Sequence, residues 1–60
     1  MKLVNETVAA EILGTTKKHM QMMRWKGVGP KYVKISASVR YSDEELQRYI
    51  LERTIDPSKK

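Results

Sequence analysis

Residues 14–41 read GTTKKHMQMMRWKGVGPKYVKISASVRY, and the rest of the 60-residue chain is organised around this stretch. It carries seven basic side chains and no Asp or Glu, while the segments on either side each have a net charge of −1, so it accounts for the whole net charge of +5. A solvated surface usually mixes both signs, whereas a block of one sign indicates a surface for a polyanion. The seven basic residues are Lys17, Lys18, Arg24, Lys26, Lys31, Lys34 and Arg40.

The length and composition narrow the possible functions. A chain of 60 residues forms one small domain that buries only about 60% of its unfolded surface, which leaves no room for an active-site cleft. The chain has no cysteine and one histidine, His19, so a disulfide, a metal site or a catalytic dyad lacks the residues to form it. We therefore expect a protein that is not an enzyme, with no catalytic residues, no metal, no cofactor and no small-molecule ligand.

The hydropathy pattern gives no sign of a membrane protein. No apolar run approaches the roughly 20 residues that span a bilayer, and Met1-Lys2 leads into no signal-peptide core. We expect a soluble chain without a membrane partner that begins at its native end.

The segment before the basic block predicts a short helix over residues 6–13. Asn5 is a good N-cap, and Gly14 is a good residue to end the helix. The small pair Ala9 and Ala10 allows a second helix to approach closely, as a tight helix-turn-helix requires. The same pair is equally typical of an ordinary helix, because alanine favours helix formation in any context.

A second helix is predicted over about residues 16–26. Thr15 or Thr16 can cap it, and Gly27 ends it. At about 100° per residue, its outward side chains mix basic, polar and apolar types. These outward side chains are Lys18, Gln21, Met22 and Trp25.

The first turn of this second helix carries Lys17 and Lys18. The helix dipole disfavours a cation there by roughly 0.3–1 kcal/mol, so stability alone does not explain the two lysines. Lysines beside the free backbone N–H groups of a helix start suit a phosphate, and polar side chains one turn later can reach the edges of bases.

The large apolar residues of the second helix are divided between core and surface. We expect Met20 and Met23 to be buried, and Met22 is open to either interpretation. Trp25 is expected to pack under the loop of residues 28–30. The alternative for Trp25 is a place at the edge of a nucleic-acid surface, as an apolar wedge or stacking group.

The second half of the basic block predicts a hairpin. Residues 31–35 and 39–41 read as two short strands around a three-residue tip, 36–38. Alternation along each strand then puts Lys34 and Arg40 on one face of the hairpin, opposite its apolar side chains.

A third helix follows the hairpin. Ser42 and Glu45 have the spacing of a capping box, and Glu44 can pair with Arg48 one turn later. Three residues at helical spacing are expected to complete the core. These are Leu46, Tyr49 and Ile50.

The chain is expected to form one domain over residues 1–54, followed by a flexible tail over residues 55–60. Leu51 and Ile55 remain after the core is filled. We expect them to form a loosely buried helix end, and a partner contact is the alternative.

The order helix, turn, helix, basic hairpin and helix predicts an α+β protein, a small winged helix-turn-helix of the reduced MerR-like kind with a two-stranded wing. Three motifs support this prediction: 9–14 (AAEILG), 29–35 with GP followed by YVKI, and 39–41 (VRY) before a capped helix. In these motifs, across about residues 4–53, the chain resembles the excisionases, also called recombination directionality factors, and the AlpA-type regulators of phages and integrative elements.

The resemblance implies a function and partners. Members of that family are small proteins that bind double-stranded DNA, and some bind as tandem copies beside an attachment site, bend the DNA and direct an integrase toward excision. The expected function is therefore that of an excisionase-like architectural protein, with integrase and neighbouring copies of itself as partners. An AlpA-type transcriptional regulator is the alternative, and the expected location is the cytoplasm of a bacterial or phage-infected cell.

The resemblance also implies which residues contact DNA. The turn and the start of the second helix would meet the major groove and its phosphates, Gln21 and Arg24 would read bases, and Lys34 and Arg40 would hold the hairpin against the backbone or minor groove. The full set is Thr16, Lys17, Lys18, Gln21, Arg24, Lys34, Ser36, Ser38 and Arg40.

Three positions depart from the family pattern. An aromatic residue is usual where Met23 stands, and here Trp25 follows two residues later, so the inner face of the second helix is expected to be rotated or repacked. Gln21 stands where arginine is common, which favours adenine over guanine in the site because glutamine pairs with adenine through two hydrogen bonds. The wing tip, commonly rich in glycine, is Ser-Ala-Ser at 36–38. A non-glycine residue with a positive φ costs roughly 1–2 kcal/mol there, so the tip is expected to be strained and its phosphate contact weaker.

A rival hypothesis from another class treats the chain as a protein-interaction module whose basic surface faces an acidic partner. Its apolar contacts would be the large side chains that the predicted core does not use. These are Met22, Trp25, Leu51 and Ile55.

Overall fold

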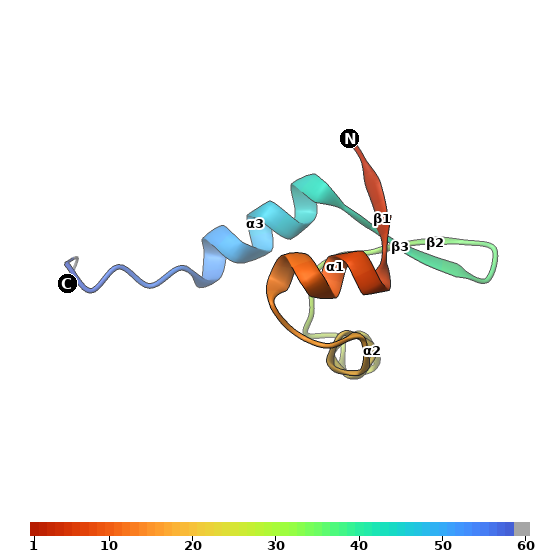
Figure 1. Cartoon of the computed structure of the whole chain (residues 1–60), viewed down its shortest axis with the longest axis horizontal. Coiled ribbons are helices and arrows are strands. Elements are labelled where there is room, and N and C mark those ends of the chain that lie inside the picture. The colour runs from red at the N-terminus through yellow and green to blue at the C-terminus, as the bar shows by residue number, and fades with distance from the viewer. Residues whose placement is uncertain (59–60) are drawn as a thin grey trace.

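The computed structural model describes residues 1–58, which form three helices and one three-stranded antiparallel sheet of strand order β1-β3-β2 (Figure 1). The protein is therefore a small α+β protein, as the sequence predicts. The elements in chain order are β1 (Leu3–Asn5), α1 (Glu6–Leu13), α2 (Lys17–Lys26), β2 (Val33–Ile35), β3 (Ser38–Ser42) and α3 (Asp43–Arg53).

The prediction of a sheet with only two strands is wrong, because β1 adds a third. Val4 of β1 lies opposite Tyr41 of β3, which makes β3 the central strand. Three residues are too few to show an alternating pattern, and the partner strand lies more than thirty residues later. This pairing therefore has no local signal in the sequence.

The ends of the first two helices follow the predicted signals. The side chain of Asn5 accepts a hydrogen bond of 2.9 Å from the backbone N–H three residues later, and Thr16, rather than Thr15, does the same for α2 at 3.1 Å. Gly14 and Gly27 end these helices with φ of 69° and 68°, a conformation that a side chain would strain.

The β2–β3 hairpin differs from the prediction by one residue of register. Ile35 pairs with Ser38, so the loop contains two residues instead of three. Lys34 therefore lies opposite Val39, and Arg40 lies opposite Val33. Directly opposed side chains share a face of the sheet, so the prediction that Lys34 and Arg40 share one face is wrong. A shift of one residue moves a side chain to the other face.

The two-residue loop strains its first residue. Ser36 has a φ of 54°, and it is the one non-glycine residue with a positive φ among residues 1–58. A two-residue hairpin with a positive φ at the first position alone has the pattern of a type II′ turn, where glycine is the usual residue. The predicted strain at the tip is thus present, at Ser36.

Replacing Ser36 by glycine should raise the free energy of unfolding by about 0.5–1 kcal/mol. The relief of about 1–2 kcal/mol of backbone strain exceeds the extra chain entropy of glycine, about 0.5–1 kcal/mol. The measurement is urea denaturation followed by circular dichroism. Ala37→Gly is the matched control and should lower stability, because the φ of Ala37 is not positive. Equal changes from the two substitutions would contradict this account of the loop.

The N-terminus of α3 is capped, but not by the predicted box. Ser42 Oγ accepts hydrogen bonds from the backbone N–H groups of Glu44 and Glu45, at 3.2 and 3.4 Å. The Glu45 carboxylate does not return to Ser42 and instead pairs with Arg48 at 3.1 Å, so the predicted Glu44–Arg48 pair is also wrong. Three-residue and four-residue spacings both bring side chains together on a helix, and the sequence does not choose between them.

The far end of α3 points away from the sheet (Figure 1). Leu51 is 71% exposed and Ile55 is 88% exposed, so the prediction of a loosely buried helix end is wrong. The predicted tail covers residues 55–60, of which 55–58 form neither helix nor strand, and 59–60 lie outside the described residues. None of the helices that residues 1–58 form is long and apolar enough to cross a membrane.

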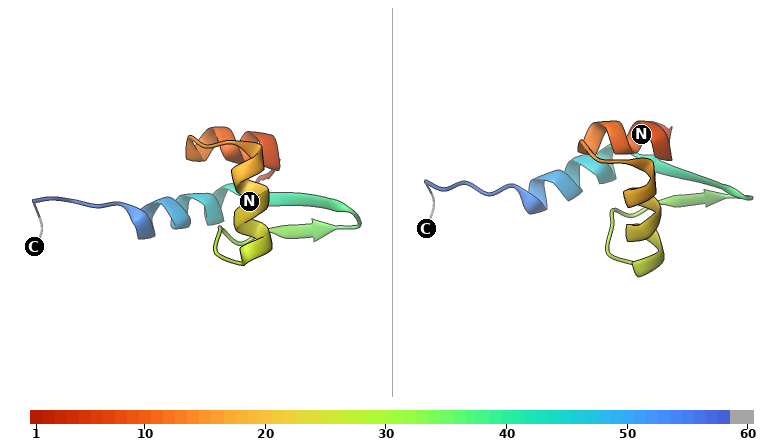
Figure 2. Two further views of the ribbon diagram at one scale, coloured as in Figure 1. Left: turned by 90° about the horizontal axis from the view of Figure 1, so that it is seen from below. Right: turned by 60° about the horizontal axis from the view of Figure 1, so that its bottom comes forward.

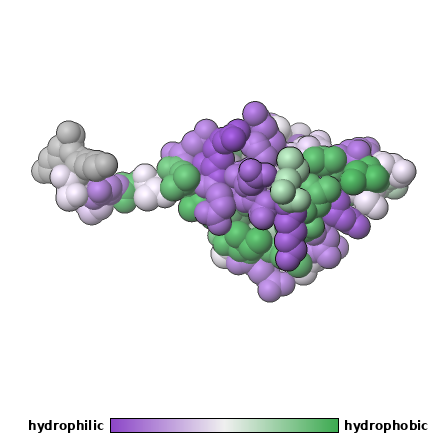
Figure 3. Space-filling view, turned by 90° about the horizontal axis from the view of Figure 1, so that it is seen from above, coloured by the Kyte–Doolittle hydropathy of each residue, from purple (hydrophilic) through white to green (hydrophobic). Residues whose placement is uncertain are grey.

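The core lies where α1, α2 and α3 meet β3. Met20 is 1% exposed, as predicted, whereas Met23 is only partly buried where it packs against the core. The small side chains of Ala9 and Ala10 allow α2 to approach α1. Figure 3 shows a face that is mostly hydrophilic, with hydrophobic residues toward the hairpin end and along the lower middle edge of the view. The buried core residues are Ala9, Ala10, Met20, Tyr41 and Leu46.

Trp25 does not join this core. It is 82% exposed, so the prediction that it packs under the loop of residues 28–30 is wrong. Met23 takes that place, since a Cβ on Gly29 would lie 3.0 Å from the Cβ of Met23. Trp25 lies five residues after Met20, which is about 140° around the helix from the buried side, too far to reach the loop.

Candidate nucleic-acid interface

An open hollow of about 370 Å³ lies between α2 and the β2–β3 hairpin. We call it the α2–hairpin groove. Figure 2 shows α2 running across the base of the hairpin, with α3 extending to the opposite side. The start of α1, one side of α2 and part of the hairpin line the groove. The lining residues are Asn5, Glu6, Thr7, Lys17, Gln21, Arg24, Ala37, Val39 and Arg40.

The groove brings together four of the nine predicted DNA-binding residues. Lys17, Gln21 and Arg24 lie at helical spacing along one side of α2, and Arg40 comes from β3. Gln21 is half-buried, and Arg40 is held by a hydrogen bond of 2.9 Å that its Nη1 donates to the carbonyl of Val39. Two elements far apart in the sequence thus contribute polar side chains to one hollow.

The other five predicted residues do not line the groove. Thr16 uses its side-chain oxygen to cap α2. Lys18 is exposed on the outer face of α2, and Ser36 and Ser38 are exposed at the far end of the hairpin. Lys34 shares its face of the sheet with Val39, which packs against the core, so it lies on the helix-bearing side of the hairpin.

Five groove residues were not among the predicted site residues: Asn5, Glu6, Thr7, Ala37 and Val39. Asn5 and Thr7 are placed beside α2 by the packing of α1 on α2, which no local pattern in the sequence specifies. Ala37 belongs to the loop at the tip, where the register of the hairpin decides which side chains turn inward. The predicted helix start at Asn5 is the only sequence signal near these residues.

A buried carboxylate fixes the floor of the groove. Glu6 is 7% exposed, and its Oε2 accepts hydrogen bonds from Nε of Arg24 and from the hydroxyl of Tyr41, both at 3.1 Å. These three residues come from α1, α2 and β3. The sequence gives no signal for this cluster, because an acidic residue in the first turn of a helix is already explained by the helix dipole.

The cluster changes the acid–base properties of its members. The hydrogen bond to Glu6 raises the pKa of Arg24 above its ordinary value. Burial, followed by the hydrogen bond to Glu6, raises the pKa of Tyr41 to about 12. Arg24 also lies over the ring of Tyr32, with its guanidinium carbon 5.9 Å from the ring centre. Arg24 therefore orients α2 through its Nε. Only the other two guanidinium nitrogens are left for a ligand.

Within residues 1–58, the other basic side chains between residues 14 and 41 are not paired with an acid, in contrast to Arg24. Six of the seven have no carboxylate within 4.0 Å in the part of the chain that the structure describes. On α3, in contrast, Arg48 pairs with Glu45 at 3.1 Å and Arg53 with Glu52 at 3.7 Å. The positive charge on α2 and the hairpin is therefore not compensated locally.

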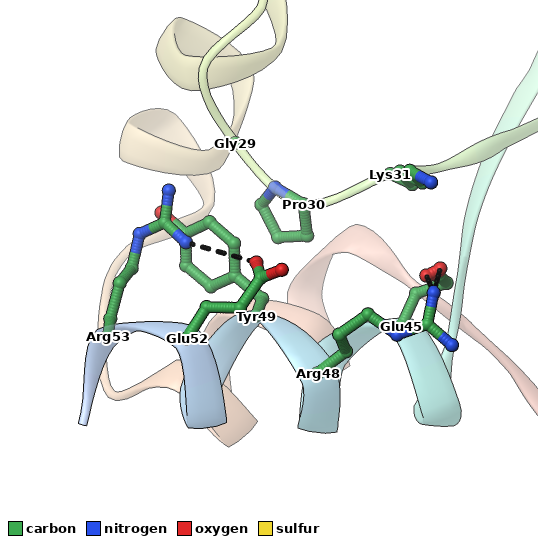
Figure 4. A pocket seen from close by; sticks show the side chains of 8 residues that line it. All are labelled: Gly29, Pro30, Lys31, Glu45, Arg48, Tyr49, Glu52 and Arg53. Carbon is green, nitrogen blue, oxygen red and sulfur yellow. Dashed lines mark hydrogen bonds and ion pairs between the residues drawn. The ribbon is translucent and has the colours of Figure 1, made fainter.

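A second hollow, of about 300 Å³, lies between the loop before β2 and α3 (Figure 4). Its two carboxylates, on Glu45 and Glu52, are both paired with arginines of α3, and Arg53 also stacks 3.7 Å over the ring of Tyr49. Lys31 is the one cation of its lining outside these pairs. Because most of its charges are already paired, this hollow has fewer unpaired cations to bind an anion than the surface of α2 and the hairpin.

No group of three His, Cys, Asp or Glu side chains that could hold a metal ion occurs within residues 1–58. No protein-family model matches this chain, and no curated protein is significantly similar to it. Its function must therefore be inferred from the chemistry of the described residues.

Replacing Glu6 by glutamine should lower the free energy of unfolding by about 2 kcal/mol, because it removes the charge that Arg24 and Tyr41 share in a buried position. Chemical denaturation measures the loss. Glu11→Gln is the matched control, since Glu11 is an exposed residue of the same helix with no ion pair among residues 1–58. It should change stability by less than about 0.5 kcal/mol. Equal losses would show that the buried cluster has no special role.

The stability should also fall at high pH as Tyr41 ionises. The folded-state pKa of Tyr41, about 12, lies above the ordinary value of 10.0. The contribution of Tyr41 to the free energy of unfolding is therefore complete below pH 10 and is lost as the pH rises toward 12. The loss should approach about 2 kcal/mol. Other groups titrate in this range, so the measurement compares denaturation of the wild type and Tyr41→Phe. An equally steep fall in the variant would exclude Tyr41 as the cause.

Proposed function

We propose that this chain binds double-stranded DNA, with α2 in the major groove and the β2–β3 hairpin against the backbone. The observation that carries the proposal is the unpaired charge: six cations between Lys17 and Arg40 have no carboxylate partner within residues 1–58. Unpaired cations on adjacent elements release counterions when they neutralise phosphates, which is the main source of affinity for DNA.

The chemistry of α2 supports its place in the major groove. It contains four cations and no acidic residue, and its ten residues extend over about 15 Å. Lys17 and Lys18 stand beside the free N–H groups at its start, where a phosphate is favoured. Gln21 follows one turn later, at a height suited to reading a base edge.

The hairpin supports a role as a wing. It projects beyond α2 to one side of the molecule (Figures 1 and 2). Lys34 lies on its helix-bearing side, so a duplex that receives α2 would also meet Lys34. The arrangement that we propose is thus a winged helix-turn-helix in which the sheet has an additional strand, β1.

The biological role that we propose is that of an excisionase-like architectural protein. A module of this size covers only about 600–1,000 Å² of interface, so one copy should bind weakly. Neighbouring copies on repeated sites, or an integrase, would raise the affinity through their effective concentration. A role as a transcriptional regulator uses the same surface and is separated from the first by the DNA that is bound.

The salt dependence of binding tests the proposed surface. With about four phosphate contacts, the log–log slope of affinity against salt should be about −3 to −4, and Lys17→Ala or Lys34→Ala should each reduce it by about one. Gln21→Ala should relax sequence preference and leave the slope nearly unchanged. The measurement is fluorescence anisotropy on a labelled duplex.

Arg48→Ala is the matched control, because it removes the same charge from α3, where Arg48 pairs with Glu45. It should leave the slope unchanged. A fall of one unit with Arg48→Ala as well would mean that only the net charge matters and that α2 and the hairpin are not the binding surface.

A gel-shift titration separates the two biological roles. It uses the attachment-site DNA and the neighbouring promoter of the element that encodes the chain, with a random duplex of equal length as competitor. A ladder of cooperative complexes of anomalous mobility on attachment-site DNA is expected for an architectural protein. A single complex confined to the promoter would favour the regulator, and no preference over random DNA would overturn both roles.

A further inference from the structure

The outer face of α2 carries two large apolar side chains that the core does not use. Trp25 is 82% exposed and Met22 is 41% exposed. At about 100° per residue, Trp25 lies between Gln21 and Lys18 around the helix, and Met22 lies just beyond Lys18. The apolar residues are thus next to the residue proposed to read a base.

Within residues 1–58, no other element covers this face. α2 forms one side of the molecule, and α1, the hairpin and α3 all lie on the other side of it (Figure 1). An exposed tryptophan contributes nothing to the core. Large apolar side chains that are exposed side by side often mark a binding site. Folding of this chain therefore does not account for Trp25 and Met22.

The charges around this face restrict what can cover it. Lys18 lies beside Trp25 and Lys26 beside Met22, and α2 has no acidic residue. A ligand for this face must therefore combine negative charges with an apolar group between them. The major groove of DNA has this chemistry, because phosphates line both of its edges and the 5-methyl group of thymine is the apolar group on its floor.

We propose that Trp25, together with Met22, contacts the 5-methyl group of thymine and makes the chain select thymine at a fixed place in its site. The inference rests on the proposed function and extends it to a specificity-determining residue. Gln21 and Trp25 are four residues apart, or about 6 Å along the helix axis, and base pairs are stacked about 3.4 Å apart. The selected thymine should therefore lie about two base pairs from the base that Gln21 reads.

The test removes only the methyl group. A preferred duplex is first selected from a random pool with the wild-type chain, and each thymine is then replaced by uracil, one at a time. Uracil at one or two positions should weaken binding about fourfold, the effect of one buried methyl group. Uracil elsewhere in the site should have no effect.

The variant Trp25→Ala should bind the thymine and uracil duplexes with equal affinity. That affinity should be no higher than the affinity of the wild type for the uracil duplex. It should fold normally, since substitutions of exposed residues usually change stability by less than about 0.5 kcal/mol. Leu51→Ala is the matched control, because it removes an apolar side chain that is 71% exposed on α3. It should keep the fourfold discrimination.

A direct contact can be shown separately. Trp25 is the single tryptophan of the chain, and 5-iodouracil places an iodine where thymine has its methyl group. Irradiation of the complex should cross-link the iodouracil at the sensitive position to the peptide that contains residues 22–25, as read by mass spectrometry. A cross-link only to other peptides would overturn the inference.

The outcomes separate the inference from the proposed function. If the chain prefers its selected duplex but binds thymine and uracil equally, the contact with thymine is excluded and DNA binding remains. If Trp25→Ala leaves both affinity and discrimination unchanged, the exposed face is excluded from the DNA interface and the inference is overturned. If selection yields no preferred duplex, the inference fails together with both proposed biological roles, since each requires sequence preference.

Discussion

The carboxylate of Glu6 is the point at which the parts of this small protein are joined. Its Oε2 accepts hydrogen bonds from Arg24 and Tyr41, so one buried oxygen connects α1, α2 and β3. A domain of this size has a total stability of roughly 3–9 kcal/mol, and loss of a buried charge partner is large on that scale. The direction of α2 relative to the sheet, and with it the shape of the α2–hairpin groove, depends on this contact.

The same contact explains how the charges are distributed. Arg24 is the basic residue of α2 that faces inward to an acid, while the other cations of α2 and the hairpin have no carboxylate partner within residues 1–58. The acidic residues of the chain lie mainly on α3, where Glu45 and Glu52 hold arginines of their own helix. The molecule is therefore electrically divided, with a compensated side at α3 and an uncompensated side at α2 and the hairpin, which is the side proposed to meet DNA.

The hairpin shows how one residue of register changes a surface. With the two-residue loop, Lys34 shares its face with Val39 and lies on the side of the helices, while Arg40 belongs to the opposite face and is tied to a neighbouring carbonyl. The positive φ of Ser36 is the strain that accompanies this short loop. A three-residue loop would shift the pairing of β2 and β3 by one residue. Lys34 and Arg40 would then lie on the same face of the hairpin. The arrangement thus places Lys34 on the helix-bearing face of the hairpin, while Arg40, on the other face, still lines the α2–hairpin groove.

The sequence by itself determined the features that depend on neighbours in the chain. The caps at Asn5 and Thr16, the helix ends at Gly14 and Gly27 and the block of positive charge are all local, because capping and left-handed glycine act within a few residues. Four features were decided by tertiary structure: the pairing of β1 with β3, the register of the hairpin, the buried Glu6 cluster and the packing of Met23 against the loop of residues 28–30. Each depends on contacts between residues distant in sequence, or on competition for one place in a small core, where Met23 and not Trp25 packs against the loop. Local patterns carry no information about such contacts, because their free energy appears only when the elements meet.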